Sequence, residues 1–293
     1  MDRKRETITA WMFLLPILVI FIGLVAVPIV ISLLLSFAEW NFLSGLKGIR
    51  FIGLQNFANL FKDQYFIQAI KNTVVYTIAT VPASLVLALV IAYMLNGKTY
   101  LQKSLRLCFF IPYISSVVAL SAVFKAMLRE NGPVNNLLRT FFNVQEPLKW
   151  FADSSLNKIP IILLVIWTAI GYELIIYIAA LQNISPSLYE AAEIDGASGL
   201  YKFLRITLPL ISPTTFYLVI IRLIATFKIF AAVNVMTLGS PTKANTSMVM
   251  RIYQEAFSNY KFGYASAEAW FLFVIILIVT VIQFRGQKKW VHY

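Results

Sequence analysis

Six long apolar runs determine what this chain can fold into. They occupy residues 11–37, 72–95, 107–128, 159–180, 209–231 and 265–284. A helix needs about 20 predominantly apolar residues to cross the hydrocarbon core of a bilayer. The first run shows no polar face at helical spacing, whereas surface helices of water-soluble proteins do. The sequence therefore predicts an all-α integral membrane protein with six transmembrane helices.

The distribution of lysine and arginine predicts the orientation of these helices, because basic residues near span ends stay on the cytoplasmic side. If the N-terminus is inside, the short inside segments hold Arg3, Lys4, Arg5, Lys98, Lys103, Arg106, Lys202, Arg205, Arg285, Lys288 and Lys289. These segments are richer in basic residues than the longer outside loops. We therefore expect a multi-pass protein of the bacterial plasma membrane with both termini in the cytoplasm.

The net charge of +12 does not indicate a nucleic-acid partner, because the basic residues lie beside span ends instead of in one patch. We interpret them as topology signals and lipid-headgroup contacts. The single cysteine, Cys108, and the single histidine, His292, provide no basis for a thiolate metal site or histidine catalysis. No glycine-rich phosphate loop is present. We expect no cofactor and no enzyme activity in this chain, with any ATP used by another polypeptide.

A polar insert, "SPSLYEAAEIDGASGLYKFLRITLPLISP", separates the fourth run from the fifth on the predicted cytoplasmic side. Ser185 before Pro186 is typical of a helix start, and Ser187 with Glu190 fits a capping box. Asp195 and Gly196 then predict a turn. A second helical piece over residues 201–206 leads into the fifth span. The sequence pattern of this bent, two-helix insert does not decide between packing on its own helix bundle and docking on a partner protein.

The residues from Glu190 to Pro209 resemble the cytoplasmic signature of permease subunits of bacterial ABC importers. That signature reads E-A-A, three residues, G, nine residues, I-x-L-P. Its matching positions here are Glu190, Ala191, Ala192, Gly196, Ile206, Leu208 and Pro209.

Further stretches resemble the carbohydrate-uptake branch of these permeases, the maltose and glycerol-phosphate type, and in particular its first-type subunit. They are "LLLSFAEWNF" at 33–42, "FIGLQNFANLF" at 51–61, Asn72-Thr73 and "IYQEAF" at 252–257. The resemblance covers about residues 13–284. The chain departs from the usual pattern at 237–241 and at Ala231, which leaves the substrate open.

The resemblance implies a type I ABC importer permease fold and a division of labour between subunits. This chain would pair with a second homologous permease above an ATPase dimer that binds ATP and magnesium. An extracytoplasmic binding protein would deliver a sugar or oligosaccharide. The coupling loop, 182–209, would dock on the ATPase through Glu190, Ala191, Ala192, Asp195, Gly196, Ile206, Leu208 and Pro209. We expect residues 1–71 to form a first span with an outer linker, 72–284 a five-helix core, and 285–293 a cytoplasmic tail.

Placing an ionisable residue inside a span costs free energy, so such residues are candidates for a functional role. Glu173 and Arg222 fall near the bilayer centre, and Lys228 and Glu268 near the outer end, so each acid has a base at similar depth. One interpretation is two structural ion pairs, Glu173 with Arg222 and Lys228 with Glu268. The other is that Arg222 or Lys228 lines the substrate path.

In the second interpretation the path also includes Trp167, Tyr172, Glu173 and Asn234. A free base there would favour an anionic saccharide or a polyol phosphate. An ion-gradient-driven secondary transporter is a further alternative, but it would be expected to show repeated halves with broken helices, and no convincing repeat is visible.

Overall fold

The computed structural model describes residues 2–97, 102–237 and 242–291. It contains four helices that are long and apolar enough to cross a membrane, namely Glu6–Ser36, Gln64–Asn96, Ile159–Gln182 and Phe262–Gly286. Two bent helix pairs are also long and apolar enough when each pair is taken together. They are Gln102–Ile114 with Val117–Met127 and Gly199–Leu210 with Ser212–Phe227. With each pair taken as one span there are six, which confirms the predicted fold class.

The chain divides into two compact units, which we describe separately. The first unit comprises residues 1–64 and 251–274. Its first span consists of α1 (Asp2–Phe21), the π-turn η1 (Ile22–Ala26) and α2 (Val27–Ser36). Pro28 lacks an N–H and its ring crowds the preceding turn, so the widened turn just before it relieves that conflict. Within the apolar stretch of this span no residue is buried.

A short connection follows this span. It consists of β1 (Ala38–Glu39), η2 (Phe42–Ser44), η3 (Leu46–Gly48), β2 (Arg50–Phe51) and α3 (Gln55–Leu60). β1 and β2 form a two-stranded antiparallel sheet with Ala38 opposite Phe51, a feature that the apolar pattern did not predict. The Asn56 amide donates to the carbonyls of Ser36 and Ala38 at 3.0 and 2.9 Å, and so fastens α3 to the end of the span.

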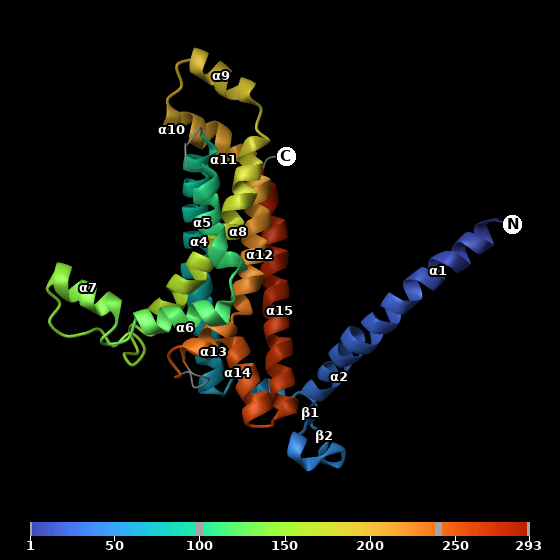
Figure 1. Ribbon diagram of the computed structural model, residues 1–293. Coiled ribbons are helices and arrows are strands. Elements are labelled where there is room, and N and C mark those ends of the chain that lie inside the picture. The colour runs from blue at the N-terminus through green and yellow to red at the C-terminus, as the bar shows by residue number, and fades with distance from the viewer. Residues whose placement is uncertain (1, 98–101, 238–241, 292–293) are drawn as a thin grey trace. The chain divides into compact units, whose positions relative to one another are not determined.

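The second unit comprises residues 65–250 and 275–293. Its helices are α4 (Gln64–Asn96), α5 (Gln102–Ile114), α6 (Val117–Met127), α7 (Pro133–Phe142), α8 (Ile159–Gln182), α9 (Pro186–Ile194), α10 (Gly199–Lys202), α11 (Leu208–Leu210), α12 (Ser212–Phe227) and α13 (Ala231–Met236). Two helices cross into the other unit, α14 (Met248–Tyr253) and α15 (Phe262–Gly286). Within the second unit, α4, α5, α8 and α12 run alongside one another (Figure 1).

Small residues allow the long helices of the second unit to approach closely. Ala88 and Ala92 of α4 are fully buried in a core that also contains Leu174 of α8 and Leu218 of α12. A Cβ on Gly171 of α8 would lie only 2.5 Å from the carbonyl oxygen of Phe109 on α5. Without a hydrophobic force between helices in lipid, such close backbone contact is a main source of association.

Two spans are bent instead of straight. α5 and α6 meet at 99°, with Ser116 between them in an extended conformation (φ −59°, ψ 121°). The second bend, 65°, falls between α11 and α12, where Pro209 and Pro213 interrupt the hydrogen-bond ladder. The second span begins at Gln64, eight residues before the predicted start at Asn72, because about two helical turns of mixed polar and apolar residues, "QYFIQAIK", precede its continuous apolar part.

Candidate functional site

The coupling loop forms a protruding helical hairpin at one end of the second unit (Figure 1). Its first helix, α9, begins at Pro186 with Ser185 as the N-cap, as predicted. The predicted capping box of Ser187 and Glu190 is not formed, because the N-cap is Ser185 and Ser187 lies inside α9, with its hydroxyl 2.8 Å from that of Ser185. The predicted second piece over residues 201–206 is α10 followed by the π-turn η4 (Phe203–Thr207).

Gly196 ends α9 in a left-handed conformation, with φ at +75°. The Ala197 N–H donates to the Ala192 carbonyl at 2.8 Å, and the Gly196 N–H donates to the Glu193 carbonyl at 3.0 Å. These two bonds form a Schellman motif, which satisfies the last carbonyls of the helix and requires a positive φ at Gly196. The predicted bend at Asp195-Gly196 therefore has a specific backbone cause.

Two side-chain contacts hold the hairpin together. The Tyr189 hydroxyl lies 2.9 Å from the Thr207 hydroxyl, which joins α9 to the returning segment. Lys202 lies 2.6 Å from Glu193 and donates a hydrogen bond that lowers the pKa of this exposed carboxyl below its usual value. The two arms of the hairpin are thus tied near the middle of α9 and near its C-terminal end.

The hairpin exposes large apolar side chains beside its charged ones. Ile194 is 87% exposed and Leu200 68%. Of the signature residues, Glu190 and Ala191 are exposed and Ala192 is half-buried. Asp195 and Gly196 are exposed, whereas Ile206, Leu208 and Pro209 are half-buried where the chain enters α12. The structure therefore presents the signature as one rigid, protruding element.

The predicted pair of Glu173 and Arg222 is present. Glu173 of α8 is fully buried, and Arg222 Nε of α12 lies 2.8 Å from its Oε1. The Ser84 hydroxyl of α4 donates to the same oxygen at 3.0 Å. Three helices of the second unit are therefore joined at one buried carboxylate.

Glu268 pairs with a base that was not predicted from the sequence. It lies 3.4 Å from Arg251 Nε in the first unit, and no ion pair among the described residues of the second unit involves Lys228. An estimate of depth from residue positions along straight spans did not include Arg251. This residue lies on α14, which folds back beside α15. The pairing of Lys228 with Glu268, which lie in different units, stays a prediction.

Arg222 and Lys228 line one cavity of about 370 Å³ in the second unit. Its other lining residues come from α6, α8, α12 and α13 and are Val117, Val165, Thr168, Ala225, Thr226, Ile229, Phe230, Ala231 and Ala232. The lining is mainly apolar with few polar groups, which is typical of small-molecule sites. Of the predicted path residues, only Arg222 and Lys228 are brought together at this cavity.

Trp167, Tyr172 and Asn234 are not among the residues that line it. Trp167 stacks on Phe124 with ring centroids 5.4 Å apart. Tyr172 stacks on Tyr113 at 5.3 Å, and its hydroxyl lies 3.1 Å from that of Tyr217. Asn234 is half-buried on α13. The aromatic partners Phe124, Tyr113 and Tyr217 had no separate signal in the sequence.

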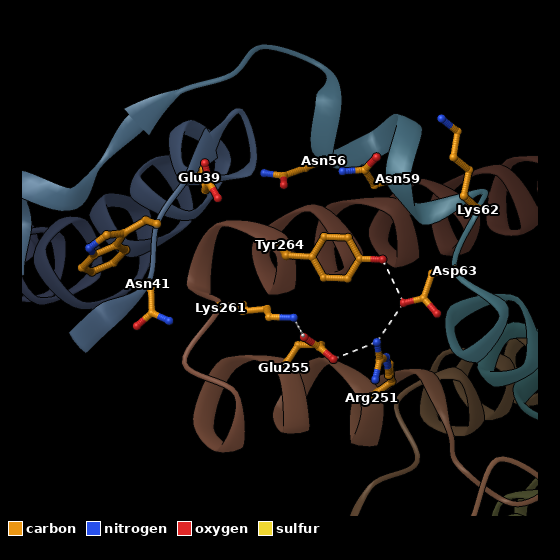
Figure 2. A pocket seen from close by; sticks show the side chains of 11 residues that line it. Glu39, Asn41, Asn56, Asn59, Lys62, Asp63, Arg251, Glu255, Lys261 and Tyr264 are labelled. Atoms are coloured by element: carbon orange, nitrogen blue, oxygen red, sulfur yellow. Dashed lines mark hydrogen bonds and ion pairs between the residues drawn. The ribbon is translucent and has the colours of Figure 1, made fainter. Parts of the chain in front are cut away.

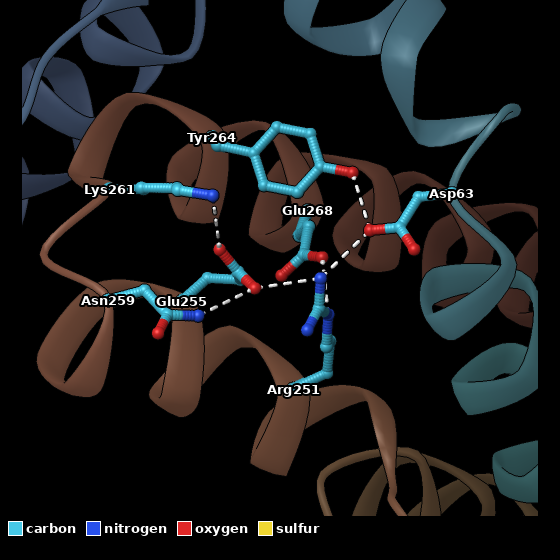
Figure 3. Close-up of polar contacts among 7 residues, drawn as sticks. All are labelled: Asp63, Arg251, Glu255, Asn259, Lys261, Tyr264 and Glu268. Carbon is cyan, nitrogen blue, oxygen red and sulfur yellow. Dashed lines mark hydrogen bonds and ion pairs between the residues drawn. The ribbon is translucent and has the colours of Figure 1, made fainter. Parts of the chain in front are cut away.

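In the first unit, a second ionic network surrounds Arg251 (Figure 3). Its Nη2 lies 2.8 Å from Asp63 Oδ2 and 2.7 Å from Glu255 Oε1. The Tyr264 hydroxyl donates to Asp63 at 3.0 Å. Burial alone would lower the pKa of the Arg251 guanidinium, but the carboxylates of Glu268, Glu255 and Asp63 raise it above its usual value. The sequence reasoning passed over this network, although Glu255 lies in the quoted stretch "IYQEAF".

Within the described ranges no group of three histidine, cysteine or acidic side chains is arranged to hold a metal ion. The departures from the family pattern at 238–241 lie outside these ranges, as does His292.

Comparisons with known proteins agree with this architecture. The chain is 34% identical to the lactose transport system permease protein LacF of Rhizobium radiobacter, over 98% of this chain and 96% of that protein. It is 31% identical to the probable ABC transporter permease protein YesP of Bacillus subtilis, over 99% and 94% respectively. A permease chain in the crystal structure of the bacterial alginate ABC transporter, in complex with an alginate pentasaccharide-bound periplasmic protein, superposes with a TM-score of 0.83 at 26% identity. That match covers 98% of this chain and 96% of the other.

The family model described as "binding-protein-dependent transport system inner membrane component" matches residues 66–290. This region contains the coupling hairpin and all candidate spans after the first. The chain thus belongs to the family of inner-membrane components of binding-protein-dependent transport systems.

Proposed function

We propose that this protein is one permease subunit of an ATP-driven importer for a sugar or oligosaccharide. Its relatives include permeases named for lactose and for sn-glycerol-3-phosphate, and a solved alginate importer resembles it over nearly the whole chain. A second permease would complete the pathway, and an extracytoplasmic protein would deliver the sugar. ATP and magnesium would bind to a pair of partner ATPase subunits.

The coupling hairpin is the observation that carries this proposal. ATP-driven closure of the ATPases must reach the pathway through a rigid element that has two discrete positions. The hairpin is internally tied, ends in a fixed glycine turn and exposes Ile194 and Leu200. Inserted in an ATPase cleft it would act as the lever, with Glu190 making a charge-assisted contact to a basic residue of the ATPase.

The topology follows from the same assignment. A hairpin that meets a cytoplasmic ATPase places both termini in the cytoplasm, in accord with the basic residues at the span ends. The first span, α1 to α2, lacks buried residues in its apolar stretch, which supports contact of that stretch with the partner permease or with lipid. Cysteine pairs that trap the first span against the partner permease would test this, whereas sugar protection of first-span cysteines would contradict it.

For the substrate path we propose the cavity of Arg222 and Lys228. The Glu173 carboxylate neutralises Arg222, so Lys228 is the better candidate for a contact to substrate oxygen atoms. Another part of the substrate path would be lined by Trp167, Tyr172 and Asn234. Lys228→Gln should change the preference between neutral and anionic saccharides while the complex stays assembled. An unchanged preference would remove Lys228 from the path.

Co-purification tests the proposed assembly directly. Affinity purification of this chain from its own membrane in mild detergent should recover a second six-span protein and an ATPase. Glu190→Ala should weaken recovery of the ATPase without reducing membrane insertion, because it removes the proposed charge-assisted contact. Glu146→Ala, which removes an exposed carboxylate outside the coupling loop, serves as the matched control. Equal ATPase recovery from all three chains would contradict the role of Glu190.

A further inference from the structure

A cavity of about 610 Å³ lies in the first unit, apart from the intramembrane pair and the coupling hairpin (Figure 2). It is formed where the first span ends and where α15 begins. Its lining residues are Glu39, Trp40, Asn41, Asn56, Asn59, Lys62, Asp63, Arg251, Glu255, Lys261 and Tyr264. Its volume is within the range of about 300 to 1,000 Å³ typical of small-molecule sites. In the proposed topology it opens to the outer face of the membrane.

The charges of the lining balance. Lys62, Arg251 and Lys261 carry three positive charges, and Glu39, Asp63 and Glu255 carry three negative charges. A site for a free anion or cation would be expected to show an excess of one sign. Three asparagine amides and two aromatic rings complete the wall. Mixed donors and acceptors beside aromatic rings fit a neutral molecule rich in hydroxyl groups.

The floor of the cavity is held in place by its own contacts. Arg251 bridges Asp63 and Glu255, and Tyr264 donates to Asp63. Trp40 packs against Phe42 and Phe262, with ring centroids 5.9 and 5.5 Å away, and these two rings also contact each other at 5.3 Å. This floor is thus preorganised, which reduces the entropic cost of binding.

The rim, by contrast, retains exposed polar groups. Glu39, Asn59 and Lys62 are exposed, and Lys261 lies at the long distance of 3.9 Å from Glu255. These side chains offer a carboxylate, an amide and two ammonium groups to hydroxyls of a bound molecule. They can be changed without opening the fixed floor.

We propose that this cavity is an outer binding site for a neutral saccharide, distinct from the intramembrane cavity that contains Lys228. The inference rests on the proposed function, because a sugar importer presents its substrate to this face. A saccharide would lie against Trp40 and Tyr264, with its hydroxyls bonded to Glu39, Lys62 and Lys261, and would cover Asn59 at the rim.

Protection of a cysteine at the rim tests the proposal in the assembled importer. Uptake by the complete complex is first screened with lactose, maltotriose, xylobiose and raffinose. Asn59→Cys in a Cys108→Ser background is then labelled with a membrane-impermeant maleimide, with and without the imported sugar. At ten times the dissociation constant about one site in eleven stays free, so labelling should slow about tenfold. Asn136→Cys, on exposed α7, is the control and should label at an unchanged rate.

Rim variants separate binding from a general effect on labelling. Glu39→Gln and Lys62→Met each remove a charge-assisted hydrogen bond at an exposed position, so the complex should still assemble. Each should raise the sugar concentration that gives half-protection by about tenfold.

Failure of the cavity and failure of the proposed function give different results. If a sugar is imported but does not protect Asn59→Cys, the cavity inference is overturned while the importer stands. Protection by the sugar-free binding protein, but not by sugar, would also overturn it and would identify a protein interface. Import of no saccharide by the complete complex would refute the proposed function, and the cavity inference with it.

Discussion

The Glu173–Arg222 pair gives the most quantitative prediction, because its two charges lie inside the second unit with little access to water. Glu173 is fully buried, and the Arg222 side chain is 15% exposed. Removing either partner leaves the other charge buried without compensation, at a cost of about 3 to 5 kcal/mol. Glu173→Leu and Arg222→Leu should each lower the free energy of unfolding by this amount.

The double variant should recover most of that loss. Replacement of a buried ion pair by apolar residues of similar volume is often close to neutral. We therefore expect Glu173→Leu with Arg222→Leu to lie within about 2 kcal/mol of the natural protein, which corresponds to a coupling energy of about 4 kcal/mol or more. The free energies would be measured by equilibrium unfolding of the purified permease in lipid nanodiscs, followed by circular dichroism.

A surface pair provides the control. Glu193→Gln breaks the exposed ion pair with Lys202 and should change the free energy of unfolding very little. Single variants at Glu173 and Arg222 that cost less than about 1 kcal/mol would refute the reasoning, as would a double variant whose loss equals the sum of the singles.

Three further substitutions test individual contacts. Gly196→Val should disrupt the Schellman turn at a cost of about 1 to 3 kcal/mol and reduce recovery of the ATPase in pull-down. Gly199→Ala should leave that recovery unchanged, because no atom lies within 4 Å of the added Cβ. Gly171→Val should prevent α5 from packing on α8 and lower the yield of folded protein in size-exclusion chromatography. Gly23→Ala, equally open at its Cβ, should leave the yield unchanged. Arg251→Lys should lower the free energy of unfolding by about 1 to 3 kcal/mol, because one ammonium cannot reproduce the forked contacts to several carboxylates, and an unchanged unfolding curve would contradict this.

The spans were predictable because a bilayer requires apolar length, and length is visible in the sequence. Ile159–Gln182 and Phe262–Gly286 lie within a few residues of the predicted runs. The bends were not predictable, since the 99° turn at Ser116 arises from tertiary packing and leaves the hydropathy of the run unchanged. The short β1–β2 sheet was missed for a similar reason, because two residues per strand give no alternating pattern.

The coupling hairpin was predictable from local chemistry, since Pro186 and Gly196 each determine the backbone at their own position. Its Schellman bonds and the Tyr189–Thr207 contact required three-dimensional coordinates.

For the intramembrane charges, depth was estimated by counting residues along each span. This estimate correctly predicted the pairing of Glu173 with Arg222, because the two residues lie on adjacent helices of one bundle. It did not find Arg251, the partner of Glu268, because Arg251 lies outside the apolar runs, on a helix that folds back beside α15. The division into residues 1–71, 72–284 and 285–293 and the roles of the path residues stay predictions.

The central claim is that ATP drives sugar import through this permease by way of its coupling hairpin. Uptake of radiolabelled sugar into proteoliposomes that contain the complete complex tests it most directly, with the binding protein outside and ATP enclosed. We predict uptake that requires enclosed ATP, does not respond to an imposed proton or sodium gradient, and is lost in Gly196→Val but retained in Gly199→Ala. Uptake driven by an ion gradient without ATP, or full uptake in Gly196→Val, would contradict the account.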